Sequence, residues 1–246
     1  MNDNETKLPV ALVSGASGGI GESICRHLVE NGYRVVATGR NEARLQALEQ
    51  SLGEHLFPLT LDVTDAGAVK ALGSRLPPEF SNPSVLVNNA GHDVGGRRLF
   101  EQGSAEQWCD IVETNVQGGI RLTHAFVDNM LARGAGHVVN IGSIAGLKPY
   151  ATGTAYVTSK YAVHGLSETL RLDFAGRGIR VTEIMPGLVR SGFAEQRLGD
   201  AQKAQDFYDS FEQCLDPDDV ASSVVFALQQ PAHVEIAQLV VLPVSG

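Results

Sequence analysis

Short apolar runs rich in β-branched residues alternate with amphipathic stretches along nearly the whole chain of 246 residues. We predict strands at residues 8–14, 33–39, 55–63, 84–90, 136–143, 179–185 and 237–243. The segments between nearly all of these runs have a helical pattern, which is typical of βαβ units. Because the runs are apolar throughout, helices should cover both faces of each strand, as in a parallel sheet. The pattern therefore predicts an α/β Rossmann fold, with a doubly wound parallel sheet of about seven strands.

The chain is expected to form a single domain over residues 1–246, because ~250 residues can share one large core. Hydrophobic residues make up 43% of the chain and charged residues 19%, which is sufficient for a folded core. No internal repeat or Pro/Gly-rich linker divides the sequence. Residues 104–133 and 154–175 are each predicted to form one long helix. In an open parallel sheet of this kind, ligands bind at the carboxyl ends of the strands.

The charge balance argues against polyanionic partners. Lysine and arginine total 19 against 28 acidic residues, and a net charge of -9 repels nucleic acid and anionic lipid. The N-terminal segment MNDNETKLPVALVSG is acidic and amide-rich where a signal peptide would be basic, and no run approaches the ~20 apolar residues of a membrane span. We therefore expect a cytoplasmic protein with a small-molecule substrate and with neither nucleic acid nor membrane as a partner.

Three cysteines, Cys25, Cys109 and Cys214, lie far apart and form no Cys-x-x-Cys motif. Their spacing suggests neither a disulfide framework nor a metal site. We expect all three to be ordinary packed thiols, and we expect no bound metal.

A glycine-rich loop directly follows the first predicted strand and precedes a helix. Its glycines have the spacing G-x-x-x-G-x-G, which lets backbone N–H groups and the positive end of a helix face a pyrophosphate. Glycines are also common in ordinary turns, so the position between strand and helix is the informative feature. The predicted dinucleotide-binding residues here are Gly15, Ser17, Gly18, Gly19, Ile20 and Gly21.

The second predicted strand ends in Thr38, Gly39 and Arg40. A site for NAD normally has an acidic residue at this point, which accepts hydrogen bonds from the ribose hydroxyls. This chain has a guanidinium there instead, and a guanidinium can bind a 2′-phosphate with two hydrogen bonds. The sequence therefore favours NADP(H) over NAD(H). The alternative is that Arg40 is a solvated residue at the start of the next helix.

Tyr156 and Lys160 lie four residues apart on a predicted helix, so their side chains share one face. Such a pair also occurs on solvated helix surfaces. A phenol is a poor base at neutral pH, but an ammonium ~4 Å away at an effective dielectric of ~20 contributes about 4 kcal/mol, or roughly three pKa units. We therefore expect Lys160 to bring the pKa of Tyr156 toward the range of acid–base catalysis.

Together these motifs resemble the short-chain dehydrogenase/reductase family over essentially the whole chain. The matching residues, in family order, are Gly15-x-x-x-Gly19-x-Gly21, Asn88-Asn89-Ala90-Gly91, Asn115, Ser143, Tyr156-x-x-x-Lys160 and Pro186-Gly187. The resemblance implies hydride transfer between NADP(H) and an alcohol or carbonyl, with Tyr156 as proton donor or acceptor and Ser143 bound to the substrate oxygen. It also implies that Asn115 distorts a long helix and holds a water in a proton relay, and that Lys160 binds the nicotinamide ribose.

The same resemblance assigns further positions to the cofactor. The family's adenine contacts match Asp62 and Val63. Its cofactor cleft matches Asn89, Ala90 and Gly91, and the segment that holds the carboxamide matches Pro186, Gly187, Val189 and Ser191. The family more often has threonine where this chain has Ser14 and Ser191, and a hydroxyl is retained at both positions. Family members are usually tetramers, so a homotetramer or homodimer is implied.

Residues 190–216 are expected to form a lid over the substrate, as the corresponding region does in the family. Phe207, Phe211 and Leu215 recur at four-residue spacing, which fits a lid helix and equally an ordinary core helix. Basic residues near this region suggest a cationic pocket for a short polar hydroxy acid or aldehyde, and solvated charges are the alternative. The predicted substrate residues are Ser143, Lys148, Tyr150 and Arg190, while Arg197 also flanks the lid.

The C-terminal segment from Asp216 onward resembles the branch of the family that contains NADP-dependent 3-hydroxy acid dehydrogenases and aldehyde reductases. A reductase of carrier-bound 3-oxoacyl thioesters would need a basic docking patch, for which only the adjacent Arg97 and Arg98 are available. A reductase of steroids or other bulky ketones would need a larger, more apolar pocket. A non-catalytic NADP-binding sensor would not need the intact set of Asn115, Ser143, Tyr156 and Lys160. We therefore expect an NADP-dependent oxidoreductase.

Overall fold

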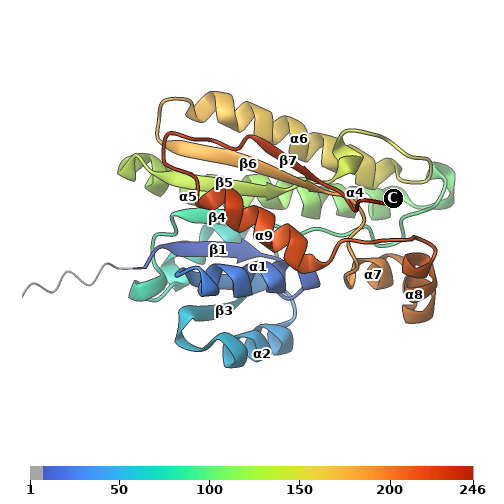
Figure 1. The fold of residues 1–246 in the computed structure, drawn as a ribbon, viewed down its shortest axis with the longest axis horizontal. Helices are drawn as coiled ribbons and strands as arrows, with labels where there is room; N and C mark the ends of the chain where they lie inside the picture. Colours follow the sequence, from blue (N-terminus) through green and yellow to red (C-terminus); the bar gives the residue numbers. More distant parts are fainter. Residues whose placement is uncertain (1–7, 246) are drawn as a thin grey trace, which may run out of the picture.

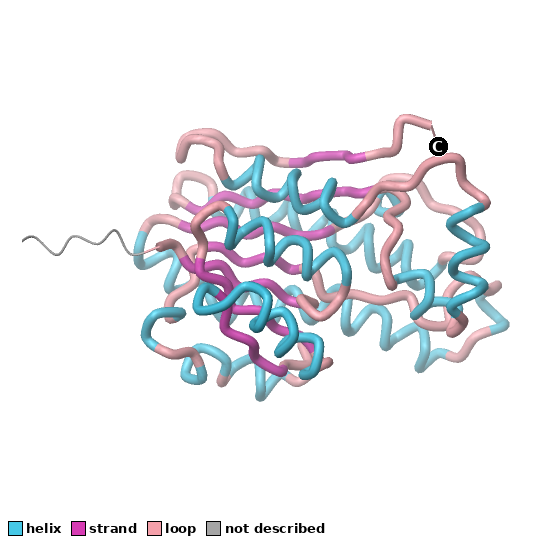
Figure 2. The backbone as a smooth tube through the Cα atoms, turned by 60° about the horizontal axis from the view of Figure 1, so that its bottom comes forward, coloured by secondary structure: helices cyan, strands magenta, loops and turns pink. Residues whose placement is uncertain are grey.

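The computed structural model describes residues 8–245, which form a seven-stranded parallel sheet in the order β3-β2-β1-β4-β5-β6-β7. The strands are β1 (Val10–Ser14), β2 (Arg34–Gly39), β3 (Leu56–Thr60), β4 (Val85–Asn88), β5 (Gly136–Ile141), β6 (Ile179–Pro186) and β7 (Gln238–Val241). Figure 2 shows them side by side as one twisted sheet. The predicted fold class is confirmed, and each predicted strand is present with its ends shifted by a few residues. Residues 1–7, where no signal sequence was expected, lie outside the described residues.

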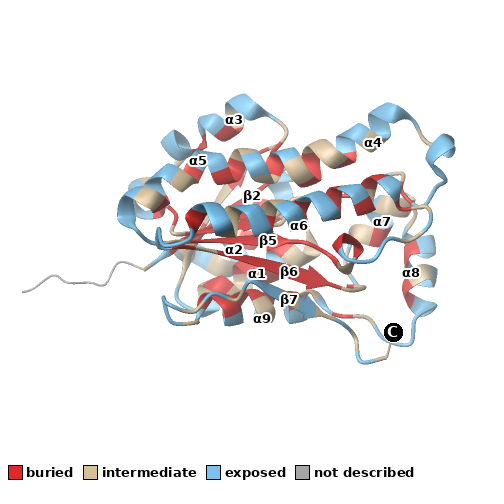
Figure 3. Cartoon of the chain, turned by 90° about the horizontal axis from the view of Figure 1, so that it is seen from above, coloured by how far each residue is buried: buried red, intermediate tan, exposed pale blue. Residues whose placement is uncertain are grey.

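Helices cover both faces of the sheet (Figures 1 and 3). One face carries α1 (Gly19–Glu30), α2 (Glu42–Leu52) and α9 (Pro217–Leu228), and the other carries α4 (Ala105–Val112), α5 (Gly118–Arg133) and α6 (Thr154–Phe174). Shorter helices are α3 (Ala66–Lys70), α7 (Phe193–Leu198) and α8 (Ala201–Asp209). Single 3₁₀ turns are η1 (Gly53–His55), η2 (Leu72–Arg75), η3 (Pro78–Phe80), η4 (Phe100–Gln102) and η6 (Ile144–Gly146).

The sheet separates two hydrophobic clusters. In β1, Ala11 and Val13 pack toward α1, α2 and α9, whereas Val10 and Leu12 pack toward α5 and the opposite face. Alternate residues of one strand therefore enter different clusters, which explains why the strands are apolar at nearly every position. Each fully buried side chain such as Leu12 contributes roughly 1.5–3 kcal/mol to folding.

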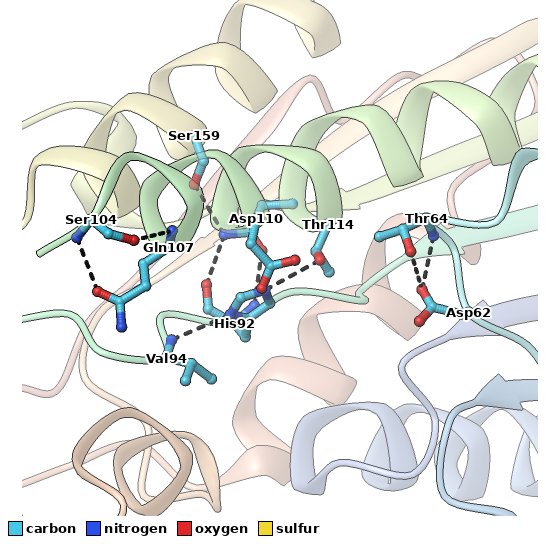
Figure 4. A network of polar contacts seen from close by, with 10 residues as sticks. Asp62, Thr64, His92, Val94, Ser104, Gln107, Asp110, Thr114 and Ser159 are labelled. Atoms are coloured by element: carbon cyan, nitrogen blue, oxygen red, sulfur yellow. Dashed lines mark hydrogen bonds and ion pairs between the residues drawn. The ribbon is translucent and has the colours of Figure 1, made fainter.

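The helix expected over residues 104–133 is present but interrupted. It starts at a capping box in which Ser104 Oγ accepts from the Gln107 N–H and the Gln107 side chain accepts from the Ser104 N–H (Figure 4). Between α4 and α5 lies one π-helical turn, η5 (Glu113–Gln117), with Asn115 at its centre. Such turns are rare and are found frequently at functional sites.

Strand order reverses between β1 and β4, because β2 and β3 extend from one side of β1 while β4 to β7 extend from the other. The loops that follow β1 and β4 therefore separate at this point and leave a crevice beyond the carboxyl ends of the strands. The fold thus places the glycine loop and the Asn88–Gly91 segment at the same opening.

The cysteines differ from the expectation in one case. Cys25 is buried and Cys214 is partly buried, but Cys109 is exposed on α4. Its neighbour Ile111 is the buried residue of that helix, so Cys109 lies on the opposite, outward side. Within the described residues, no helix combines the length and hydropathy that a membrane span requires.

Because of His137, in β5, we expect the stability of the fold to fall at acid pH. Its side chain is buried, Nε2 lies 2.8 Å from Thr182 Oγ1, and burial, aided by the Arg180 charge, lowers the pKa of His137 to about 3. Between that value and the unfolded pKa of about 6.5 only the unfolded chain binds the proton, so stability is lost as pH falls below 6.5. Between pH 6.5 and 5 the loss is about 2 kcal/mol, at about 1.4 kcal/mol per pH unit. We expect urea unfolding at pH 7 and pH 5 to show a drop larger by this amount in the wild type than in His137→Gln. Equal drops would contradict the assignment.

Candidate active site

A cavity of about 1020 Å³ opens at the carboxyl ends of the strands and is bordered by α7 and α8. Of the residues predicted from the sequence, it is lined by Gly15, Ser17, Gly18, Gly19, Ile20, Gly21, Arg40, Asp62, Val63, Asn89, Ala90, Gly91, Ser143, Lys148, Tyr150, Tyr156, Lys160, Pro186, Gly187, Val189 and Ser191. Asn115 and Arg190 are not part of this lining. The structure therefore gathers nearly all of the predicted positions around one opening.

The glycine loop has a conformation that side chains would obstruct. Gly15 has a φ of +68°, and a Cβ there would lie 2.9 Å from Ala90 Cα. A Cβ on Gly21 would overlap the carbonyl oxygen of Gly15. The Asn89 amide donates to the carbonyl oxygens of Ser14 and Gly15 at 3.0 and 3.2 Å. The loop is therefore packed against the segment that follows β4.

Ser14 adds a second link between the same two segments. Its Oγ accepts hydrogen bonds from the N–H groups of Asn89 and Ala90, both at 3.0 Å, and donates to the Val87 carbonyl at 3.3 Å. The serine hydroxyl, at a position where the family more often has threonine, therefore makes hydrogen bonds both as donor and as acceptor.

The N-terminus of α1 faces the cavity without a capping side chain. Gly18 is the N-cap residue and makes no side-chain hydrogen bond, and Gly18, Gly19 and Ile20 all line the cavity. Free N–H groups and the positive end of the helix dipole are thus directed at a bound group. This arrangement fits a pyrophosphate.

Two guanidinium groups lie on the β2 side of the cavity. Arg40 follows β2, and Arg44, on α2, donates from Nη1 to the Ser17 carbonyl at 3.3 Å. Arg44 was not predicted, although its position four residues after Arg40 on the following helix was a usable signal. Together the two arginines can surround a phosphate.

Asp62 lines the same cavity as these arginines. Burial acts to raise the pKa of the Asp62 carboxyl, but hydrogen bonds from the N–H and hydroxyl of Thr64, at 2.9 and 2.8 Å, hold it below its usual range (Figure 4). The carboxylate is therefore ionised at neutral pH and is fixed in one orientation.

Ser143, Tyr156 and Lys160 all line the cavity. Ser143 follows β5, and its Oγ accepts from the Ala145 N–H at 3.1 Å. Tyr156 and Lys160 lie one turn apart on α6, and Lys160 Nζ donates to the Ile141 carbonyl at 2.9 Å. Burial lowers the pKa of Lys160 to about 8, and the nearby charge of Glu183 opposes this effect.

Burial has the largest effect on the pKa of Tyr156. Lys160 Nζ lies 5.6 Å from the centroid of the Tyr156 ring, and burial raises the pKa of this tyrosine well above its usual value. The effects that oppose burial are a hydrogen bond with Ser143 and the charge of Arg197. In this structure the Lys160 ammonium donates to the Ile141 carbonyl. That Lys160 brings the pKa of Tyr156 toward the range of acid–base catalysis stays a prediction.

Asn115 links the π-helical turn to the loop after β4 and to α6. Its Oδ1 accepts from the His92 N–H at 2.8 Å, and its Nδ2 donates to the His92 carbonyl and to Ser159 Oγ, both at 3.0 Å. Asn115 also borders a second cavity of about 10 Å³, shared with Asn88 and Asn140. That volume is close to what one water molecule requires.

A buried histidine that sequence reasoning missed supports this turn. His92 Nε2 lies 3.2 Å from Thr114 Oγ1 and 3.5 Å from Asp110 Oδ2 (Figure 4). Burial lowers the pKa of His92, so the ring is neutral at pH 7 despite the Asp110 charge. Its position directly after the Asn88–Gly91 motif was the only available signal.

Arg190 does not contact the cavity, contrary to the prediction. Its guanidinium lies 3.3 Å from Asp209 Oδ1 and stacks over the Tyr208 ring, with Cζ 5.1 Å from the ring centroid. The exposed carboxylate on α8 therefore holds the side chain outside the pocket. The arginines that do line the cavity are Arg97 and Arg197.

The predicted lid consists of two short helices, α7 and α8, followed by a turn. Phe207 and Phe211 line the cavity, but Leu215 pairs with Val189 and joins the main core. The four-residue stripe is therefore divided between cavity and core. Tyr208 fixes α8 to the segment after β6, because its hydroxyl donates to the Ser191 carbonyl at 2.8 Å.

A doubly wound sheet with a glycine turn at the reversal of strand order defines a dinucleotide-binding protein. The chain belongs to the short chain dehydrogenase family, whose model matches residues 9–202. It is 41% identical over 238 residues to an NADP-dependent 3-hydroxy acid dehydrogenase of Salmonella typhi, with 96% of this chain and 95% of that protein covered. It is 34% identical over 234 residues to a serine 3-dehydrogenase of Agrobacterium fabrum, with 95% and 93% covered.

Solved structures agree with this assignment. The closed form of a serine dehydrogenase complexed with NADP+ superimposes with a TM-score of 0.92 at 40% identity, covering 96% of this chain and 95% of that one. The serine dehydrogenase from Escherichia coli gives a TM-score of 0.83 at 37% identity, covering 96% and 98%.

Proposed function

We propose that this protein is an NADP(H)-dependent oxidoreductase that transfers a hydride between the cofactor and a short polar hydroxy acid or the corresponding carbonyl compound. The observation that carries the proposal is the convergence of Ser143, Tyr156 and Lys160 on a cavity that also contains the glycine turn and Arg40. The names of the similar hydroxy acid and serine dehydrogenases support the same reaction and substrate class.

The cofactor is assigned to the cavity by complementary chemistry. The open N-terminus of α1 and its glycine turn suit the pyrophosphate, and Arg40 with Arg44 suits the 2′-phosphate. The remaining positions proposed to line the cofactor are Asp62, Val63, Asn89, Ala90, Gly91, Pro186, Gly187, Val189 and Ser191. When bound, the nicotinamide supplies or accepts the hydride.

The protein groups then manage the proton and the substrate oxygen. Tyr156 donates a proton to the oxygen in reduction and accepts it in oxidation. Ser143 hydrogen-bonds the same oxygen. Lys160 holds the ribose and keeps a positive charge beside the phenol, while Asn115 maintains the helix turn next to a water-sized cavity.

Removing the Arg40 guanidinium should reduce the preference for the phosphorylated cofactor. We expect Arg40→Ala to lower the ratio of kcat/KM for NADPH to that for NADH by about 10- to 100-fold, since a hydrogen bond to a charged group contributes about 1.5–3 kcal/mol. Arg34→Ala is the matched control, because Arg34 lies at the opposite end of β2 and donates to the Glu79 carbonyl. An unchanged ratio in Arg40→Ala would refute the phosphate-binding role.

The substrate class is tested by initial rates of nicotinamide absorbance change with NADP and NAD. The panel should contain short 3-hydroxy acids, polar alcohols, simple secondary alcohols, bulky ketones and acyl thioesters. Turnover confined to NADP and small polar substrates supports the proposal, whereas turnover only of bulky ketones or thioesters contradicts it. Arg97 lines the cavity and is also exposed with Arg98, so this pair supplies only a thin basic patch for a carrier protein.

We also propose a homo-oligomer, a dimer or tetramer, and a cytoplasmic location. Exposed apolar side chains on α6, α9 and the outer strand β7 support oligomerisation, among them Leu172, Phe226 and Val240. Light scattering that gives a monomer mass at micromolar concentration would exclude it. Cell fractionation tests the location.

A further inference from the structure

Two arginines from different segments border the cavity near Tyr156. Arg197, on α7, places its Cζ 5.8 Å from the Tyr156 ring centroid and 5.0 Å from that of Phe193. Arg97, in the loop after β4, places its Cζ 5.3 Å from the Tyr150 ring centroid. Both guanidinium groups therefore lie on the side of the cavity that holds the proton donor, away from Arg40.

The two guanidinium groups differ in whether a carboxylate forms an ion pair with them. Arg197 has 9% of its side chain exposed, and its Nε lies 2.7 Å from Oδ2 of Asp93, whose side chain is 2% exposed. Asp93 therefore compensates Arg197. Within residues 8–245, no carboxylate oxygen lies within ion-pair distance of Arg97. The cavity wall thus carries one guanidinium charge that the protein itself does not neutralise by contact.

Aromatic rings hold Arg97 in place. Its Cζ also lies 5.2 Å from the centroid of Phe207, so the guanidinium contacts rings from the loop after β5 and from α8. Stacking on rings restricts the side chain but leaves the N–H groups in the plane of the guanidinium available to an acceptor. A planar cation fixed in this way can bind a carboxylate with two parallel hydrogen bonds.

The backbone of the loop directs the side chains of Asp93 and Arg97 to different partners. The Gly96 N–H donates to the Asp93 carbonyl at 2.9 Å, and a Cβ on Gly96 would overlap the Asp93 carboxylate. Arg97 has a φ of 62°, a left-handed conformation that costs a residue with a side chain roughly 1–2 kcal/mol. One tight turn thus directs a carboxylate inward to Arg197 and a guanidinium outward to the cavity.

We propose that Arg97 selects substrates that carry a free carboxylate, with Arg197 as a second cation beside the bound group and Asp93 as the residue that positions Arg197. The inference rests on the proposed function and makes it more specific. With the substrate oxygen at Ser143 and Tyr156, a carboxylate a short distance along the same molecule lies toward the two guanidinium groups. A neutral analogue leaves Arg97 without an anionic partner.

The test compares one substrate in charged and neutral form. NADP-dependent oxidation of 3-hydroxybutyrate and of its methyl ester is measured for the wild type, Arg97→Ala, Arg97→Lys and the control Arg190→Ala. Arg190 is a suitable control because it also stacks on an aromatic ring of the lid region but binds Asp209 outside the cavity. Arg97 is exposed and its removal leaves the buried Asp93–Arg197 pair intact, so the variant is expected to fold.

We expect Arg97→Ala to lower kcat/KM for the acid by about 10- to 100-fold, mainly through KM, and to change kcat/KM for the ester less than threefold. Arg97→Lys should recover part of the loss, and Arg190→Ala should match the wild type on both compounds. Equal losses on acid and ester would show that Arg97 only supports the lid, and no loss on the acid would show that it does not bind substrate. Either result overturns the inference while the proposed reaction stands. A wild type inactive on both compounds, and on the wider panel, would instead refute the proposed function.

Discussion

Tyr156→Phe is expected to reduce turnover by at least 10²- to 10⁴-fold while NADPH binds within about threefold of the wild type, since positioned general acids typically contribute rate factors of this size. The substitution removes one hydroxyl and keeps the ring, which packs against Phe193 at a centroid distance of 5.6 Å. Burial raises the pKa of Tyr156, so the phenol is protonated at neutral pH, as an acid in carbonyl reduction must be. Single-turnover rates and NADPH fluorescence titration measure the two effects separately.

The control for this variant is Tyr161→Phe. Tyr161 lies on the same helix, is exposed and donates from its hydroxyl to the Leu147 carbonyl at 2.8 Å. Its loss should leave turnover near the wild-type value. If Tyr156→Phe retained more than a tenth of the activity, another group would have to transfer the proton, and Tyr150, which also lines the cavity, would be the next candidate.

Gly21→Ala is expected to weaken NADPH binding by at least about 100-fold. The added Cβ would overlap the Gly15 carbonyl oxygen and lie 2.7 Å from Asn89 Nδ2, and both belong to the links that hold the glycine turn. Relief of these contacts requires the turn or α1 to move, which displaces the N–H groups at the start of the helix. A conformational shift of this kind costs more than the helix propensity that alanine gains, which is at most about 1 kcal/mol.

Gly165→Ala provides the comparison, because a Cβ at this exposed position on α6 meets open space. It should bind NADPH normally and stabilise the fold by up to about 1 kcal/mol. Calorimetric titration and thermal unfolding of both variants separate loss of binding from loss of folding. Normal affinity in Gly21→Ala would mean that the turn tolerates a side chain and that its close packing is not required for the cofactor.

The sequence was sufficient for the sheet and for the residues whose position depends on local spacing. The apolar runs located the strands, and the four-residue interval placed Tyr156 and Lys160 on one face of α6. Side-chain directions that depend on distant partners could not be predicted. Lys160 is directed at the carbonyl of Ile141 in β5, and Arg190 is held by Asp209, a residue nineteen positions later on another element.

The same limit explains why Arg97 was considered only as part of a basic docking patch. Its approach to the cavity depends on a left-handed turn and on rings contributed by Tyr150 and Phe207, which lie 53 and 110 positions away in the sequence. A spacing pattern within one segment carries no information about such contacts. The π-helical turn at Asn115 is a contrasting case, since resemblance to the family implied a distortion that the local residue pattern did not.

Because strand order reverses between β1 and β4, the segments proposed for cofactor preference and for proton transfer lie in different parts of the chain. The segments proposed to discriminate between cofactors follow β1 and β2, whereas the side chains proposed to transfer the proton follow β5 and lie on α6. Substitutions in groups without shared partners usually have additive effects on free energy. Cofactor preference could therefore be redesigned at positions 40 and 44 without refitting the acid–base chemistry, and natural variation could explore the two properties one at a time.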